Sequence, residues 1–249
     1  AYSNRFKIET LSVSPEETLG ANTRSEQEKL EQIYRKMKNE ELLEKGIALI
    51  DKSRVDVRGD LHAGTDCIID VNVIFEGTVE LGNNVKIGAN SILRNTKIDD
   101  NSEILPFSHI DSSQIGKGCF IGPYARLREG SQIADGARIG NFVETKKTKI
   151  GQSTKANHFT YLGDAEIGND VNIGAGTITC NYDGKNKNKT HIGDNSFIGT
   201  NSSLVAPVDI GKNTYVGAGS TITKDIPDNS LGISRSKQKN VQDWPKKKK

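Results

Sequence analysis

The feature that most constrains this chain is an aliphatic residue that recurs every six positions from about Val57 onward. Gly or Asp usually follows it, and a small or β-branched residue stands four places later. Two of the longer series are Ile69, Phe75, Leu81, Ile87 and Leu93, and then Ile192, Ile198, Leu204, Ile210, Val216 and Ile222. A fixed short period over so many copies is the sequence signature of a parallel β-helix.

Three hexads make one triangular coil, so residues about 18 apart should stack on neighbouring rungs about 4.8 Å apart. The aliphatic residue would fill the core and the small residue would fit the tight turn. Aromatics make up only 6% of the chain, which also contains 25 glycines, and a narrow solenoid core needs few large rings. The sequence predicts a mainly β fold, a left-handed parallel β-helix over residues 57–226.

The residues before the repeat follow a helical period instead. Apolar residues recur at three-to-five-residue steps between charges, and Gly46 supplies a stop. These residues are Leu30, Ile33, Tyr34, Met37 and Leu42. We expect one amphipathic helix from Ser25 to about Lys45, within a linker of residues 24–56. Residues 227–249 are expected to form a C-terminal arm with a basic tail.

The six-residue rhythm breaks between Thr179 and His191. The segment from Cys180 to Lys189 is polar and basic and has no hexads, so it is expected to form a loop. Interruptions of a regular scaffold are places where function concentrates.

Composition and motifs argue against several function classes. A net charge of +2 indicates no nucleic-acid partner, and no apolar stretch approaches the length of a membrane span. Three widely spaced cysteines fit a cytoplasmic protein. A β-helix zinc site needs three converging histidines, and the four present do not cluster: His62, His109, His158 and His191. Neither a P-loop nor a Ser-His-Asp order stands out.

The repeat register also places charged side chains. Arg128 and Lys146 each come one place after the start of a hexad and lie 18 residues apart, so they should stack on one face. Adjacent cations repel unless an anion bridges them, which indicates a phosphate site. Two solvated surface charges are an equally good interpretation of this pair alone.

An imidazole, a carboxylate and a phenol fall near the same place. His158 and Ala175 should lie one rung apart, and Glu144 and Tyr161 both close their hexads. We expect the group to wrap one corner, with the cations on one side, His158 on the other, and Glu144 and Tyr161 between. Such a group would be an acid–base pocket for an anionic substrate, although a lone histidine is usually structural.

Four stretches resemble one known family. They are IGPYARLR (residues 121–128), GNFVETKK (140–147), HFTYLGDAE (158–166) and NIGAGTITCNYDG (172–184). They are similar to the acetyltransferase portion of the bacterial bifunctional N-acetylglucosamine-1-phosphate uridyltransferase/glucosamine-1-phosphate N-acetyltransferase, and the similarity runs from about Asn22 to Arg235.

The resemblance implies acetyl transfer from acetyl-CoA to the amine of glucosamine-1-phosphate, a step toward UDP-N-acetylglucosamine and the cell wall. It implies that His158 is the general base and that Glu144 orients or polarises the reacting groups. The implied sugar-phosphate contacts are Arg128, Lys146, Tyr161, Asn172 and Lys187. The implied acetyl-CoA contacts are Ala175, Asn181, Tyr182, Thr200, Ala218 and Arg235. Glu129, Thr145 and Thr200 depart from the residues often found in the family at these positions.

The family's other half has little counterpart here. Residues 1–23 resemble only the end of the uridyltransferase domain, and Asn22 matches one position of its metal and nucleotide site. We therefore expect no uridyltransferase activity from this chain, and acetyl transfer itself needs no metal. The resemblance also implies a homotrimer, with the loop and the C-terminal arm reaching neighbouring subunits.

Two alternatives remain open from the residues. One is a hexapeptide acyltransferase for another amine or hydroxyl, which would share the coil and the histidine. The other is a non-catalytic β-helix scaffold.

Overall fold

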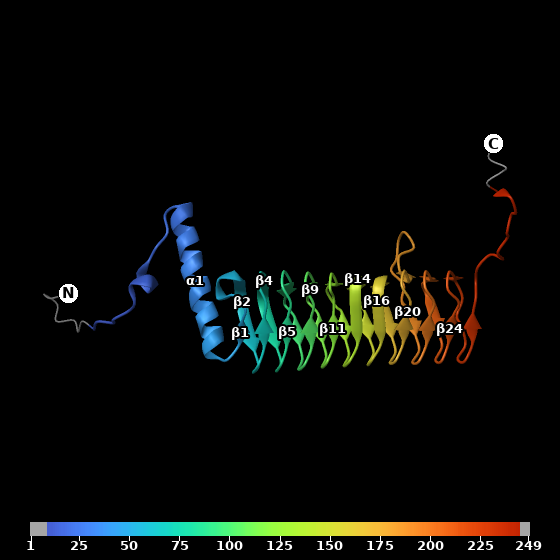
Figure 1. Cartoon of the computed structure of the whole chain (residues 1–249), viewed down its shortest axis with the longest axis horizontal. Coiled ribbons are helices and arrows are strands. Elements are labelled where there is room, and N and C mark those ends of the chain that lie inside the picture. Colours follow the sequence, from blue (N-terminus) through green and yellow to red (C-terminus); the bar gives the residue numbers. More distant parts are fainter. Residues whose placement is uncertain (1–8, 245–249) are drawn as a thin grey trace.

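The structure is a computed structural model, and it describes residues 9–244. An elongated triangular coil of parallel strands carries a helix, α1 (Arg24–Glu44), at its N-terminal end and an extended arm at its C-terminal end (Figure 1). The predicted left-handed parallel β-helix with one preceding helix is confirmed. Among the described residues, no helix has the length and apolarity needed to span a lipid bilayer.

Within residues 9–244, the remaining elements are two short 3-10 helices and the strands of the coil. The 3-10 helices are η2 (Pro15–Thr18) and η3 (Lys52–Arg54). The strands are β1 (Ala48–Leu49), β2 (Val55–Ala63), β3 (Ile68–Ile69), β4 (Val73–Leu81), β5 (Lys86–Ile87), β6 (Ile92–Arg94), β7 (Lys97–Ile98), β8 (Glu103–Ile104), β9 (His109–Asp111), β10 (Gln114–Ile115), β11 (Phe120–Ile121), β12 (Arg126–Leu127), β13 (Gln132–Ile133), β14 (Arg138–Lys146), β15 (Lys149–Ile150), β16 (Lys155–Gly163), β17 (Ala165–Ile167), β18 (Asn172–Ile173), β19 (Ile178–Cys180), β20 (Thr190–Ile192), β21 (Phe197–Ile198), β22 (Ser203–Val205), β23 (Val208–Ile210), β24 (Tyr215–Val216), β25 (Thr221–Ile222) and β26 (Leu231–Gly232).

Each rung stacks on the next in a register close to the predicted one. Val55 of β2 pairs with Val73 of β4, which is the expected step of three hexads. Some turns are one residue shorter, so that β14 pairs Glu144 with Tyr161 of β16. The step is longer between β17 and β20, where the predicted loop is inserted.

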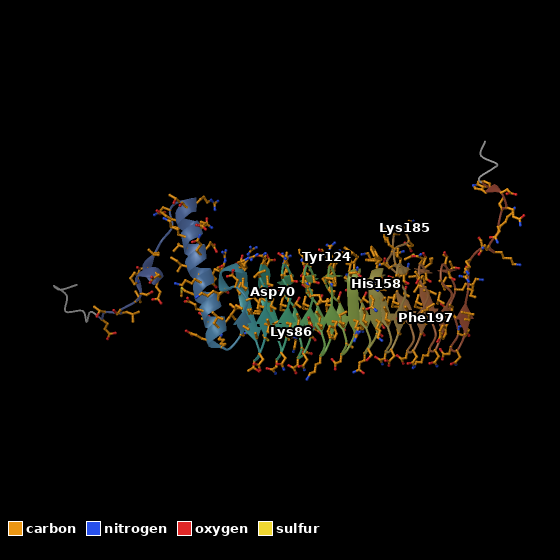
Figure 2. The ribbon with its side chains drawn as sticks, in the orientation of Figure 1. Asp70, Lys86, Tyr124, His158, Lys185 and Phe197 are labelled. Carbon is orange, nitrogen blue, oxygen red and sulfur yellow. The ribbon has the colours of Figure 1, made fainter. Side chains whose placement is uncertain are left out.

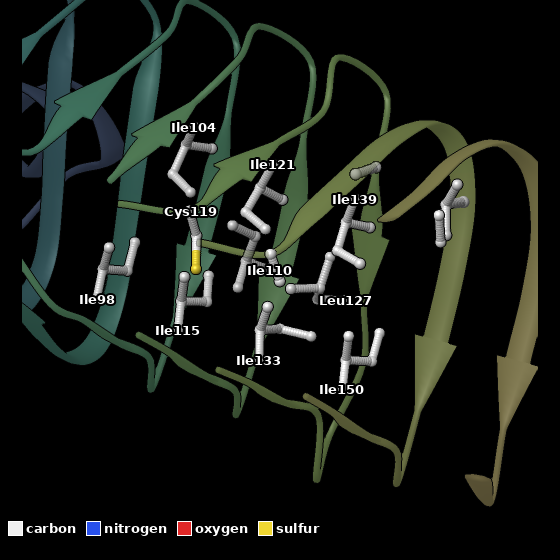
Figure 3. Close-up of a cluster of buried hydrophobic side chains, with 14 of the residues drawn as sticks. Ile98, Ile104, Ile110, Ile115, Cys119, Ile121, Leu127, Ile133, Ile139 and Ile150 are labelled. Carbon is white, nitrogen blue, oxygen red and sulfur yellow. The ribbon is translucent and has the colours of Figure 1, made fainter. Parts of the chain in front are cut away.

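The core is a column of hexad side chains inside the coil. Ile104, Ile121 and Ile139 are fully buried one above another, and Figure 3 shows them pointing inward from successive rungs. The small residues four places later are buried too, not confined to turns. Most of the hydroxyls among them hydrogen-bond to main-chain carbonyls, as Thr154 Oγ1 does to Gly168 O at 2.7 Å. Thr190, at the equivalent position before Ile192, is an exception, because its Oγ1 is buried without a hydrogen-bond partner.

Helix α1 closes the N-terminal end of the coil. It begins with a capping box between Thr23 and Glu26 and ends before Gly46, whose φ is +82°. Asn39 Nδ2 donates to the carbonyls of Lys52 and Val55, at 2.7 and 2.9 Å, and so anchors the helix on the first coil. The predicted helix is confirmed, but much of its apolar stripe stays exposed.

The domain bounds given above remain predictions. The stacking of strands begins at β1, which pairs with β3 and so precedes residue 57. It reaches β26, which pairs with β24 beyond residue 226. The predicted basic tail at 245–249, and the first eight residues of the predicted 1–23 segment, lie outside the described residues.

Candidate functional site

One edge of the triangular coil carries His158, and we call it the His158 corner. The chain turns there through a residue with positive φ on successive rungs: Asn72, Asn90, Phe107, Tyr124, Phe142, Phe159, Gly176, Asn201 and Gly219. We call the rungs on the C-terminal side of His158 the upper rungs. Main-chain hydrogen bonds connect them, from Gly176 N to Phe159 O at 2.9 Å and from Gly219 N to Thr200 O at 2.8 Å. His158 is exposed near the middle of the coil (Figure 2).

Asn141 holds the imidazole of His158. The two residues pair across β14 and β16, and Asn141 Oδ1 lies 2.8 Å from His158 Nδ1. An amide oxygen can only accept, so Nδ1 donates its proton and the lone pair of Nε2 is left free. Sequence reasoning missed Asn141, although it lies one short rung of 17 residues before His158.

The strand residues between two corners form the face on which the candidate acid–base groups lie. This site face holds Glu144 of β14 and Tyr161 of β16, which are neighbours across the ladder. Glu144 accepts from Arg128 Nη1 at 2.9 Å and lies 3.5 Å from Arg126 Nη1. The bond to Glu144 raises the pKa of the Arg128 guanidinium above its ordinary value. The side chain of Glu144 therefore lies between two arginines.

Cations gather at the far end of the site face, which we call the basic corner. Leu127 pairs with Thr145, so Arg128 and Lys146 follow on adjacent rungs, as predicted. Glu129 lies between them, 3.4 Å from Lys146 Nζ and 4.0 Å from Arg128 Nε. The third cation is Lys187, whose pKa is lowered chiefly by the neighbouring Lys146.

The expectation that the whole group wraps one corner is wrong. The positive-φ residues Phe142 and Lys147 mark two successive corners, and Glu144 lies between them. His158 is at the first corner and the cations are at the second, so the group lies along one face. At roughly 3.3 Å per residue, the strand from Val143 to Lys146 spans about 10 Å.

Gly163 makes room for the phenol of Tyr161. It pairs with Lys146 across the ladder, and a Cβ at this position would overlap Tyr161 Oη. The missing side chain lets the hydroxyl extend along the face toward the basic corner. Sequence reasoning did not identify Gly163.

The predicted loop is confirmed and is internally organised. Asp183 Oδ1 accepts from the N–H groups of Lys185 and Asn186 at 2.8 and 2.7 Å, which lowers the pKa of that carboxyl. At its base, Asn181 Nδ2 donates to Asp164 Oδ2 at 2.5 Å. This anchoring positions Lys187 beside Lys146.

The predicted acetyl-CoA contacts form two groups. Ala175, Thr200 and Ala218 each precede the positive-φ residue on successive rungs of the His158 corner, and Arg235 Nη1 donates to Ala218 O at 2.7 Å. Asn181 and Tyr182 lie instead in the loop. Within one chain, the loop pair is at the basic corner and the others are at the His158 corner.

Two predicted residues lie off the site face. Asn172 pairs with Lys155 and with Phe197, on the face that precedes the His158 corner. Asn22 lies at the start of α1, where its N–H donates to Glu26 Oε2 at 2.8 Å.

Two of the three cysteines are buried inside the coil, and the third, Cys180, is partly exposed at the start of the loop. Burial raises the pKa of the Cys119 thiol to about 11, and Cys67 is buried as well. Within residues 9–244, no three His, Cys, Asp or Glu side chains are grouped to hold a metal ion.

Comparison with known proteins gives consistent matches. Residues 112–147 and 189–224 match the family described as Bacterial transferase hexapeptide (six repeats). The bifunctional protein GlmU of Aromatoleum aromaticum is 48% identical over 247 residues, covering 97% of this chain and 54% of the relative. The GlmU of Acidithiobacillus ferrooxidans is 51% identical over 228 residues, covering 92% and 50%.

A solved structure supports the fold alone. The UDP-N-acetylglucosamine acyltransferase from Campylobacter jejuni matches with a TM-score of 0.51 at 17% identity, covering 73% of this chain and 71% of that chain. The chain spans about half the length of the curated relatives it matches. It therefore belongs to the family of bifunctional GlmU proteins and corresponds to their C-terminal, hexapeptide-repeat portion.

Proposed function

We propose that this chain transfers the acetyl group of acetyl-CoA to the amine of glucosamine-1-phosphate, in UDP-N-acetylglucosamine synthesis. The observation that carries the proposal is the site face itself. It has an oriented imidazole at one end and three cations at the other.

His158 acts as the general base. With Nδ1 donating to Asn141, Nε2 accepts a proton from the substrate amine as its nitrogen attacks the thioester carbonyl. The C–N bond forms, the tetrahedral oxyanion collapses, and the C–S bond breaks to release CoA, which takes up the proton. The Ala175 N–H makes no hydrogen bond with the described residues, so it is our candidate donor to the oxyanion.

The basic corner binds the phosphate. Arg128 and Lys146 can contact a phosphate from adjacent rungs, and Lys187 approaches from the loop. Charge-assisted hydrogen bonds of this kind are strong and fix the orientation of the ligand. Tyr161 and Asn172 are the proposed contacts to the sugar.

Acetyl-CoA lies along the upper rungs of the His158 corner. Ala175, Thr200 and Ala218 present small side chains there, and Gly219 has open space where a side chain would extend. A homotrimer would bring Asn181 and Tyr182 of one subunit toward this acetyl-CoA surface of another subunit. No metal is required by this reaction.

The first test is the substitution Lys146→Ala. Losing a charged partner of the phosphate costs about 1.5–3 kcal/mol, so the KM for glucosamine-1-phosphate should rise roughly ten- to hundredfold. The KM for acetyl-CoA should change little. Lys149→Ala is the matched control, because Lys149 pairs with Glu166 on the next face. Equal effects of Lys146→Ala on both substrates would place this lysine outside the phosphate site.

The alternatives predict different substrates. An acyltransferase for another amine would accept glucosamine as readily as its 1-phosphate, whereas our proposal requires the phosphate. A scaffold would release no CoA with any amine. Steady-state rates with amino sugars, with and without the 1-phosphate, separate the three.

A further inference from the structure

Glu129 occupies the place where the substrate's phosphate should bind. Its two carboxylate oxygens face Lys146 Nζ at 3.4 Å and Arg128 Nε at 4.0 Å. Desolvation opposes ionisation of this carboxyl, but its own backbone N–H and the Lys146 ammonium hold its pKa below the usual value. Glu129 is therefore a charged partner of two of the cations assigned to the phosphate.

Glu129 is held more loosely than the other carboxylate at the site. Glu144 is fixed by a 2.9 Å bond to Arg128 and by Arg126 on its other side. The side chain of Glu129 is 48% exposed, and its contacts are longer. Lys146, in contrast, is only 14% exposed, so the ammonium stays in place while the carboxylate can rotate into solvent.

We propose that Glu129 is a displaceable internal counter-ion that competes with the phosphate of the substrate for Lys146 and Arg128. The proposal deepens the function given above and rests on it for the identity of the sugar phosphate. What the test measures is the competition between the Glu129 carboxylate and a phosphate for Lys146 and Arg128.

This competition would set specificity for dianions. A phosphate monoester carries up to two charges and can contact Lys146 and Lys187 together, whereas Glu129 carries one charge. A monovalent anion such as chloride gains no such advantage over a tethered carboxylate. The basic corner would thus reject monovalent anions at the cost of some affinity for phosphate.

The test is the binding of inorganic phosphate to the whole chain, measured by isothermal titration calorimetry. Exposed ion pairs contribute little, so Glu129→Gln should tighten phosphate binding by about two- to fivefold. Inhibition of phosphate binding by chloride should become stronger. Glu80→Gln is the matched control, because Glu80 is similarly exposed and pairs with Lys97 on another face. Its phosphate affinity should equal that of the unmodified chain.

A double variant identifies the shared partner. In a Lys146→Ala background, adding Glu129→Gln should produce a much smaller gain, since the main contested cation is gone. The proposal is overturned if Glu129→Gln binds phosphate no tighter than the unmodified chain. It is equally overturned if the gain is undiminished without Lys146, or if neither protein binds phosphate.

These titrations are independent of acetyl transfer. A chain that binds phosphate as described but does not acetylate glucosamine-1-phosphate would refute the proposed function and leave the role of Glu129 standing. A chain that acetylates this sugar with unchanged phosphate affinity in Glu129→Gln would do the reverse.

Discussion

The lower and upper rungs of the His158 corner share a backbone conformation and differ in side chains. On the four rungs from Phe107 up to the rung of His158, the positive-φ positions hold stacked rings, with Phe107 and Tyr124 centroids 4.9 Å apart and Phe142 and Phe159 centroids 5.1 Å apart. Above it, the same positions are Gly176, Asn201 and Gly219. The aromatic column ends on the rung of the histidine.

The difference shows how a repeat separates stability from function. A left-handed backbone costs a non-glycine residue about 1–2 kcal/mol, and stacking of neighbouring rings offsets that cost with about 0.5–1.5 kcal/mol per pair. The rungs from Phe107 to Phe159 therefore carry a continuous stack of aromatic rings. The rungs after Phe159 leave an open surface beside Ala175 and Ala218. The hexads specify the corner, and the corner residues specify what can lie on it.

The largest expected effect comes from removing the imidazole of His158, which lies where the aromatic stack ends. His158→Ala should lower kcat for acetyl transfer by roughly 10²–10⁴-fold, the usual contribution of a general base. The KM for either substrate should change little. His191→Ala is the control, because His191 is an exposed histidine near Glu166 on another face. Full turnover by a correctly folded His158→Ala protein would reject the assignment of the base.

A second prediction places an aromatic ring on the open surface proposed for acetyl-CoA. Gly219→Phe should raise the KM for acetyl-CoA by roughly ten- to hundredfold, since overfilling an occupied space costs about 1–3 kcal/mol. The coil should still form, because phenylalanine already adopts this backbone at Phe142. Circular dichroism checks the fold. An unchanged KM for acetyl-CoA would show that the donor does not lie along Gly219.

The converse change has the smallest expected effect. Phe142→Gly removes two stacked pairs, those with Tyr124 and Phe159, but relieves the left-handed strain. The free energy of unfolding should fall by about 1 kcal/mol. The KM for acetyl-CoA should stay the same, and denaturant titration with steady-state kinetics measures both. A large rise in that KM would contradict the assignment of acetyl-CoA to the open surface rather than to the aromatic stack.

The fold was predictable because a six-residue period leaves few ways to bury an aliphatic column. Arg128 and Lys146 were placed on adjacent rungs by counting alone, and the loop after Cys180 was evident from the missing hexads. These features depend on spacing, which the sequence displays directly.

The details of the site depend on geometry that spacing does not display. The corner lies at the residue with positive φ, and hexad counting does not identify Phe142 as that residue. Several rungs are a residue shorter than three hexads, and the one that joins Asn141 to His158 hid the pairing of these two residues. The position of Glu129 between two cations depends on side-chain rotamers, which a repeat does not determine.

The most direct measurement of the central claim is CoA release from acetyl-CoA by the unmodified chain, followed with a thiol reagent while the sugar is analysed by mass spectrometry. The account predicts one thiol per molecule of N-acetylated sugar phosphate with glucosamine-1-phosphate, and little release with glucosamine. Release no faster than spontaneous hydrolysis, in a folded protein with both substrates at saturating concentration, would contradict it.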